Sequence, residues 1–192
     1  KIDLNKIEEL GSLYDDYVLP LRITSSTGEP MGQNKYTKVL AHIGFKNDYS
    51  GTYSGKGIIT QQGTTYTTEI TSTQLYAINN DICYMFVGEK TRANTPDYLN
   101  YVVEIKRDEW GGITLSSEVG SLEFKSYNSK LSRKYTYNYN DQRYYTEITT
   151  VELAYEYLDK TQSEDLRMTF EGSFSMSRDV LRVEYPNVDV EE

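Results

Sequence analysis

Histidine, cysteine and tryptophan each occur once in this 192-residue chain, at His42, Cys83 and Trp110. One cysteine cannot form an intramolecular disulfide, so a disulfide framework within the chain is excluded. One histidine and one cysteine cannot supply the usual zinc ligand sets, and a Ser–His–Asp or Cys–His arrangement would have to use His42. We therefore predict no metal site, no cofactor and no catalytic residues, and we expect that the protein is not an enzyme. Oxygen-only calcium sites and paired carboxylates need neither residue type and stay open as alternatives.

The chain also lacks long apolar runs, phosphate-binding motifs and an excess of positive charge. No stretch approaches the length of a membrane span, and neither GxxxxGK[ST] nor GxGxxG is present. The 20 Lys and Arg residues face 29 Asp and Glu residues, which gives a net charge of −9. Such a field repels phosphate backbones and anionic headgroups. We expect no nucleic acid partner and no membrane-spanning segment.

Tyrosine is abundant, with 19 copies beside five phenylalanines. Tyrosine, threonine and serine at this density favour β structure. The stretch Asp165–Ser177 (DLRMTFEGSFSMS) has apolar residues at even positions and polar residues at odd ones. Because a strand sends alternate side chains to opposite faces, this period of two predicts a long strand with one buried face. Gly172 lies on the buried face, where a missing side chain permits a bend or a close backbone approach.

The order of turns and strands predicts two parts, residues 1–46 and 47–192. In the first part, a short helix is expected within residues 2–13, and strands are expected at Tyr17–Ile23 and Tyr36–Phe45. In the second part, eight or nine strands joined by short turns follow Tyr49. We therefore predict an all-β protein: an antiparallel up-and-down lipocalin-like barrel of about eight strands, preceded by a short immunoglobulin-like β segment.

Two finer predictions concern the register of the strand at Tyr144–Leu158 and the position of acidic residues on expected strands. Its apolar register shifts between Ile148 and Val151, which indicates a β-bulge around Thr149–Thr150. Four carboxylates on expected strands follow the alternation of outward residues and are assigned to a solvated outer face: Glu104, Glu147, Glu152 and Glu171.

Aromatic and amide side chains in loops carry the sequence's main functional indication. Tyrosine and tryptophan offer flat apolar faces with a polar group, which suits stacking on sugar rings. Amides donate and accept hydrogen bonds, as neutral sugars require. Trp110 lies in the turn DEWGG, and the other candidates lie in or beside long polar loops. The predicted ligand-binding residues are Trp110, Tyr98, Tyr135, Tyr137, Tyr139, Asn138 and Asn140. The alternative is that these tyrosines pack on the barrel wall.

Two stretches resemble a known family. Tyr17–Gly28 (YVLPLRITSSTG) resembles the last strands of an immunoglobulin-like domain in secreted lipoproteins of gut Bacteroidetes. Tyr49–Gly57 (YSGTYSGKG), followed by hairpins to a terminal SFSMSR strand, resembles the lipocalin-like (calycin-like) barrel that often follows that domain. The family is largely of unknown function, and its members lie near polysaccharide-utilisation systems. The resemblance implies an extracellular or outer-membrane surface location, with a shortened immunoglobulin-like part and no lipid-anchor cysteine in this chain.

The leading hypothesis is non-catalytic binding of an oligosaccharide or polysaccharide at the bacterial cell surface, linked to polysaccharide utilisation. One alternative is a lipocalin-like carrier that holds a small apolar ligand inside the barrel. Another is a structural or assembly module that pairs through its N-terminal edge strand.

Overall fold

The computed structural model describes residues 14, 17–22, 38–108 and 112–191, and the chain divides into two compact units, residues 1–45 and 46–192. The helix expected within residues 2–13 lies outside the described residues. In the first unit, β1 (Tyr17–Arg22) pairs antiparallel with β2 (Lys38–Ile43). Pro20 lies opposite Leu40 in this pair. A strand of a two-stranded sheet always has a free edge, so the missing N–H of Pro20 is tolerated there.

Within the described residues, the second unit is built on a sheet of ten strands. The strand bounds are β3 (Gly51–Gln61), β4 (Thr67–Ala77), β5 (Ile82–Phe86), β6 (Val102–Arg107), β7 (Ile113–Ser116), β8 (Lys125–Ser126), β9 (Lys130–Tyr137), β10 (Tyr144–Asp159), β11 (Leu166–Leu181) and β12 (Val190–Glu191). In the ranges that the structure describes, three short 3-10 helices connect them: η2 (Tyr98–Tyr101), η3 (Gly120–Leu122) and η4 (Arg182–Glu184). The all-β prediction is confirmed. The count exceeds the predicted eight because β8 and β12 are strands of two residues each.

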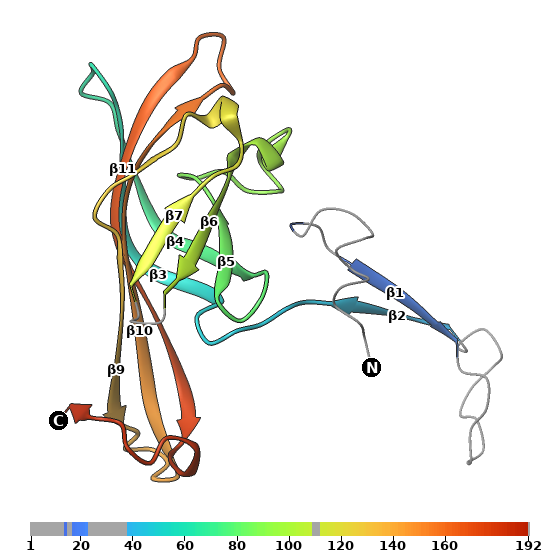
Figure 1. Cartoon of the computed structure of the whole chain (residues 1–192), viewed down its shortest axis with the longest axis vertical. Coiled ribbons are helices and arrows are strands. Elements are labelled where there is room, and N and C mark those ends of the chain that lie inside the picture. The colour runs from blue at the N-terminus through green and yellow to red at the C-terminus, as the bar shows by residue number, and fades with distance from the viewer. Residues whose placement is uncertain (1–13, 15–16, 23–37, 109–111, 192) are drawn as a thin grey trace. The chain divides into compact units, whose positions relative to one another are not determined.

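The sheet runs in the order β12-β9-β10-β11-β3-β4-β5-β6-β7, and β8 pairs with β10 beyond the end of β9. The pairs are antiparallel except for β12 with β9. Since β7 contacts β8, the path of strands from β10 through β11 and β3 to β7 returns to β10. β9, β10 and β11 extend beyond the shorter strands toward the end of the unit where the C-terminus lies (Figure 1).

The predicted alternation in β11 is confirmed, because Met168, Phe170 and Phe174 are buried and face the interior. The ring of Phe170 stacks on that of Tyr155 with centroids 4.8 Å apart. Gly172 lies between Leu153 of β10 and Gly57 of β3 in the paired register. A Cβ atom at Gly172 would lie 2.8 Å from the Gly57 Cα, so the close approach expected there is present.

The bulge predicted in β10 is wrong, and so is the outer-face position predicted for Glu147, whereas Glu104, Glu152 and Glu171 are not buried. β10 pairs with β11 in unbroken register from Tyr144 to Asp159, and so has no bulge at Thr149–Thr150. The irregularity of the sheet lies instead in β3, between Ser54 and Gly57. Because the alternation of β10 continues without a shift, Glu147 and Thr149 occupy inward positions and are buried. Glu147 is therefore not on the outer face.

Candidate functional site

A buried ion pair organises the end of the second unit where β10 ends. Asp159 is the last residue of β10, and Lys90 lies in the loop after β5. The Lys90 Nζ lies 2.7 Å from the Asp159 Oδ2, and both side chains are about nine-tenths buried. Lys90 also donates a hydrogen bond to the Thr161 Oγ1 at 2.9 Å, and the Thr161 hydroxyl donates to the Asp159 Oδ1 at 2.6 Å. Burial alone would raise the pKa of Asp159, but the hydrogen bonds from Lys90 and Thr161 outweigh it and lower that pKa.

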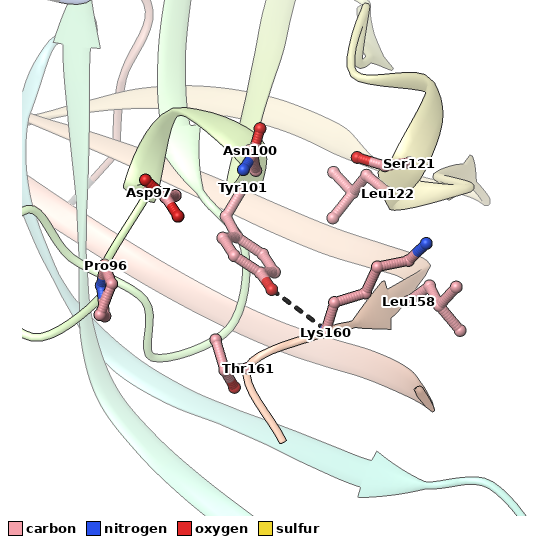
Figure 2. Close-up of a pocket in the computed structure, with 9 residues that line it drawn as sticks. All are labelled: Pro96, Asp97, Asn100, Tyr101, Ser121, Leu122, Leu158, Lys160 and Thr161. Carbon is pink, nitrogen blue, oxygen red and sulfur yellow. Dashed lines mark hydrogen bonds between the residues drawn. The ribbon is translucent and has the colours of Figure 1, made fainter. Parts of the chain in front are cut away.

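One pocket lies beside this ion pair, on the side of η2, and is called here the Tyr101 pocket (Figure 2). Its volume is about 280 Å³, and its lining residues are Pro96, Asp97, Asn100, Tyr101, Ser121, Leu122, Leu158, Lys160 and Thr161. The Tyr101 hydroxyl accepts a hydrogen bond from the backbone N–H of Lys160 at 3.0 Å. The Lys90 Nζ lies 5.4 Å from the centroid of the Tyr101 ring. Burial raises the pKa of Tyr101, so its hydroxyl stays protonated.

A second pocket lies between the β3–β4 hairpin and the β10–β11 turn, and is called the Tyr66 pocket. Its volume is about 360 Å³, and Tyr66 in its wall is 60% exposed. The Thr68 hydroxyl donates a hydrogen bond to the Tyr66 hydroxyl at 3.2 Å, which holds the ring at the pocket edge. The apolar lining residues are Ile59, Tyr157, Leu166 and Met168. The polar lining residues are Gln61, Thr68, Glu89, Lys90, Asp159, Gln162, Ser163 and Glu164.

A third pocket of about 300 Å³ joins these two into one rim. It shares Pro96 and Thr161 with the Tyr101 pocket, and it shares Glu89, Lys90 and Gln162 with the Tyr66 pocket. The rim therefore combines an exposed aromatic ring, apolar patches, amides, hydroxyls and carboxylates around the fixed Lys90–Asp159 pair. This combination can stack on one face of a ring while exchanging hydrogen bonds with its hydroxyl groups.

Of the predicted binding residues, Tyr98 lies nearest to this rim in the sequence, at the start of η2. Its ring packs edge-on against Phe86 at 5.6 Å between centroids, and the Arg92 guanidinium lies 5.8 Å from its centroid. Tyr98 thus belongs to an aromatic cluster beside the Tyr101 pocket and does not line it. Trp110 lies outside the described residues.

The other five predicted residues gather at the opposite end of the long strands. Tyr137 is opposite Tyr145 in the β9–β10 register. Tyr145 is near the start of β10, fifteen residues before Lys160, which follows the end of that strand. At the rise of a β-strand, this separation is on the order of 50 Å. Tyr139 is 85% exposed, and the Asn138 Oδ1 accepts hydrogen bonds from the backbone N–H groups of Asn140 and Asp141. The predicted residues therefore do not form a single site with Tyr98.

Tyr135 and Tyr137 at this distal end contact charged side chains. The Tyr135 hydroxyl donates a hydrogen bond to the buried Glu147 carboxylate at 2.9 Å. Burial and this hydrogen bond both raise the pKa of Tyr135. The Arg182 guanidinium lies 5.1 Å from the Tyr137 ring centroid and 4.7 Å from that of Tyr145. Tyr135 is thus half-buried and engaged inside the sheet, whereas Tyr139 is free to meet solvent.

The space enclosed by the strands of the second unit is filled by side chains along the middle of β10 and β11. Phe174 and Tyr155 are almost completely buried, and the Tyr155 hydroxyl accepts a hydrogen bond from the Gly88 N–H at 2.9 Å. Of the buried hydrophobic residues on these two strands, Tyr157 and Met168 line the Tyr66 pocket. An apolar ligand would therefore reach the open end of the space enclosed by the strands rather than its centre.

The sequence interpretation missed the rim. Tyr66 follows the Gln61–Gly63 turn. It is a tyrosine beside a loop, like the tyrosines predicted to bind ligand, so its residue type and position could have indicated it. Lys90 and Asp159 carried no local indication, because they are 69 positions apart in the sequence and are joined only by folding.

The described residues include neither a metal-ligand cluster nor a membrane-spanning helix. Among residues that the structure describes, no group of three or more His, Cys, Asp or Glu side chains is placed to hold a metal ion. No helix in those ranges has the length and hydropathy needed to cross a membrane.

Comparison with known proteins gives one family match. A protein-family model with the description “-like, C-terminal” matches residues 37–175, well over half of the 192-residue chain. A comparison with curated proteins finds no match.

Several solved structures share the fold at low sequence identity. One is a protein of unknown function from Bacteroides ovatus, with 19% identity, a TM-score of 0.72, and coverage of 86% of this chain and 58% of that one. Another is an auxiliary nutrient binding protein from Bacteroides thetaiotaomicron, with 17% identity, a TM-score of 0.69, and coverage of 86% and 58%. A third is a multidomain protein including DUF1735 from Bacteroides ovatus, with 16% identity, a TM-score of 0.64, and coverage of 75% and 62%. The chain spans about six-tenths of the length of these structures.

Proposed function

The chain belongs to the “-like, C-terminal” domain family that matches residues 37–175, and from this premise we propose that it binds carbohydrate without catalysing a reaction. The proposed partner is an oligosaccharide or polysaccharide, bound at the bacterial surface as part of nutrient capture. A fold relative from Bacteroides thetaiotaomicron is named an auxiliary nutrient binding protein, which supports this class of role. We also propose that the ten-stranded unit is lipocalin-like and that the protein acts as part of a surface lipoprotein.

The observation that carries the proposal is the exposed Tyr66 ring in a pocket of about 360 Å³ that also holds amides and hydroxyls. A sugar ring has an apolar face and a polar circumference. Tyr66 can stack on the face, while Gln61 and Gln162 can both donate to and accept from the hydroxyls. The adjoining Tyr101 pocket supplies Asn100 and further hydroxyls for a neighbouring sugar unit.

The charge state of Asp159 suits a structural role better than that of a general acid. A general acid in a glycosidase needs a carboxyl group whose pKa is raised. Asp159 is the most buried carboxylate at the rim, and its pKa is lowered by Lys90 and Thr161. Its role in the proposal is to hold Lys90 and the loop after β5 in place, so that the walls of the pockets are fixed before the ligand arrives.

The test compares two exposed tyrosines at opposite ends of the unit. Neutral oligosaccharides are screened on a glycan array, and hits are titrated by calorimetry against wild type, Tyr66→Ala and Tyr139→Ala. We expect Tyr66→Ala to weaken binding about tenfold or more, which corresponds to about 1.4 kcal/mol. Tyr139→Ala should leave the affinity unchanged. Trp110→Ala is a third arm, because the sequence selects that residue.

Two outcomes would reject the rim as the binding site. One is that no neutral glycan binds. The other is that Tyr139→Ala or Trp110→Ala abolishes binding while Tyr66→Ala has no effect, which would return the site to the residues predicted from the sequence.

The apolar floor of the Tyr66 pocket favours a second candidate, a carrier of a small apolar ligand. Ile59 and Met168 form this floor and are buried. A fluorescent fatty-acid probe distinguishes the two functions: a carrier would bind it at the pocket and lose it in Met168→Glu, whereas a glycan-binding protein would not bind it.

A further inference from the structure

The β4 strand has a free edge over most of its length. On one side it pairs with β3 from Thr67 to Leu75. On the other side, β5 pairs with it only at Tyr76 and Ala77. Among the described residues, no strand covers the second edge of β4 from Thr67 to Gln74. Edge strands present unpaired N–H and C=O groups to which another strand can add.

A groove follows this free edge. Its volume is about 480 Å³, and it is lined by the consecutive β4 residues Glu69–Gln74, by Gly88–Thr91 on the opposite side, and by Thr52, Tyr76 and Phe86. Tyr76 and Phe86 pack against each other with centroids 6.0 Å apart. The groove thus has one wall of strand backbone, one wall of loop and an aromatic patch, and six residues of a strand extend about 20 Å.

The backbone of Glu69 points into this groove. The Gln61 N–H donates to the Tyr66 carbonyl oxygen at 3.2 Å, so these two residues form a hydrogen-bonded pair. The register then continues through Thr60 with Thr67, Ile59 with Thr68, and Ile58 with Glu69. Hydrogen-bonded and non-hydrogen-bonded pairs alternate in an antiparallel ladder, so the N–H and C=O of Glu69 face away from β3.

The free edge of β4 differs from that of β9. Along β9, Lys130, Arg133 and Lys134 supply the charges with which proteins commonly protect an edge. The β4 stretch from Thr67 to Gln74 contains one charged residue, Glu69, in an otherwise hydroxyl-rich sequence. The β4 edge therefore has little protection against an added strand except the loop at Gly88–Thr91.

We propose that this groove binds an extended, basic peptide segment of another protein, which adds to β4 as a further antiparallel or parallel strand. Main-chain hydrogen bonds to the free edge would supply affinity, and alternate side chains of the peptide would lie in the groove beside the partly exposed Tyr76. The negative charge of the molecule selects the occupant: the chain carries a net charge of −9, and Glu69 and Glu89 at the groove are both exposed. The cations at the groove are held in ion pairs, because the Lys56 Nζ lies 2.8 Å from the Glu69 Oε2 and the Lys90 Nζ lies 2.7 Å from the Asp159 Oδ2. The same net charge opposes pairing with a second copy of this chain.

The experiment is an NMR titration of the full chain with a synthetic peptide, acetyl-Thr-Lys-Val-Lys-Thr-Lys-Val-amide. Amide shifts should change along Thr67–Gln74 and at Gly88–Thr91. A peptide of the same sequence with every backbone nitrogen methylated presents no N–H on either edge, cannot pair as a strand and should leave these shifts unchanged. A peptide with Glu in place of Lys should bind at least tenfold more weakly.

Two variants separate backbone pairing from charge. Glu69→Pro removes the N–H that points into the groove, at an edge position where proline is tolerated, and should abolish the shifts. Glu69→Gln keeps the N–H but removes the carboxylate that holds Lys56, and should weaken binding severalfold and reduce its dependence on salt. Circular dichroism checks that Glu69→Pro is folded, and the N-methylated peptide gives the same test on the unaltered protein.

The proposal is overturned by equal binding of the N-methylated peptide, by shifts elsewhere or by no shifts. It is also overturned if the β4 amides shift with protein concentration alone, which would indicate pairing between copies. Displacement of the peptide by a neutral oligosaccharide would assign the groove to glycan. Failure of peptide binding leaves the Tyr66 comparison intact, so the two proposals are tested separately.

Discussion

Replacing Arg178 by alanine tests the buried charge cluster that the structure places inside the distal end of the sheet. The Glu147 side chain is completely buried. Its Oε1 accepts a hydrogen bond from the Arg178 Nε at 2.7 Å, and its Oε2 accepts one from the Tyr135 hydroxyl at 2.9 Å. The Arg133 Nη1 lies 3.6 Å from the same Oε2. Burial alone would lower the pKa of Arg178, but the hydrogen bond to Glu147 outweighs it and raises that pKa. In Arg178→Ala, the Oε1 atom loses this donor.

The size of the effect follows from how well the remaining groups compensate. Removing one partner of a buried ion pair costs about 3–5 kcal/mol, because a charge stays buried without compensation. Here the Arg178 side chain is 31% exposed, so water can enter the space it leaves, and Arg133 still faces the carboxylate. We therefore expect the lower end of the range, a loss of about 3 kcal/mol in the free energy of unfolding. In Glu147→Leu/Arg178→Met, both charges are removed, and at least half of that loss should be recovered.

Urea unfolding of the full chain at neutral pH, followed by far-ultraviolet circular dichroism, measures these differences. The matched control is Lys130→Ala, which removes a cross-strand ion pair to Glu152 on the outer face. The two side chains of that pair are 66% and 44% exposed, so solvent screening limits the expected loss to about 0.5 kcal/mol. If Arg178→Ala loses no more than Lys130→Ala, or if the double variant is less stable than the single one, then Glu147 does not depend on Arg178 for its burial.

Three further outcomes are expected. Gly172→Ala brings a Cβ atom 2.8 Å from the Gly57 Cα and should lower the free energy of unfolding by about 1–3 kcal/mol. Gly120→Ala, with open space around the new Cβ, should be neutral. Equal melting temperatures of the two variants would contradict the close approach. Burial raises the pKa of Tyr155 and other core tyrosines. The stability that they contribute is therefore complete below the ordinary tyrosine pKa of about 10 and is lost as the pH rises toward the pKa of the folded state. A urea midpoint that does not fall above about pH 10 would refute this. Burial raises the pKa of Cys83 to about 12, so a thiol reagent at neutral pH should label it only as fast as the protein opens, and rapid labelling of the native protein would show an accessible thiolate.

The sequence by itself determined the class of fold and the strand around which it is built. The alternation in β11 is a local property, since the two faces of a strand are decided by successive residues whatever its neighbours are. Phe170 and Phe174 are therefore buried as predicted. Gly172 was identified by the same local reasoning, because a missing side chain on a buried face permits close approach of another backbone.

Tertiary structure alone decided which polar groups are buried and which loops meet. Glu147 was assigned to the outer face because it follows the alternation of outward residues, and the bulge in β10 was inferred from the shift of the apolar register between Ile148 and Val151. Its actual partner is Arg178, opposite it on β11 and 31 residues away in the sequence. In the same way, Tyr66 and the Lys90–Asp159 pair meet only at the end of the closed strand path. A charge is stable inside a protein only when its counter-charge is beside it, and proximity between distant residues is a property of the folded chain that no local pattern contains.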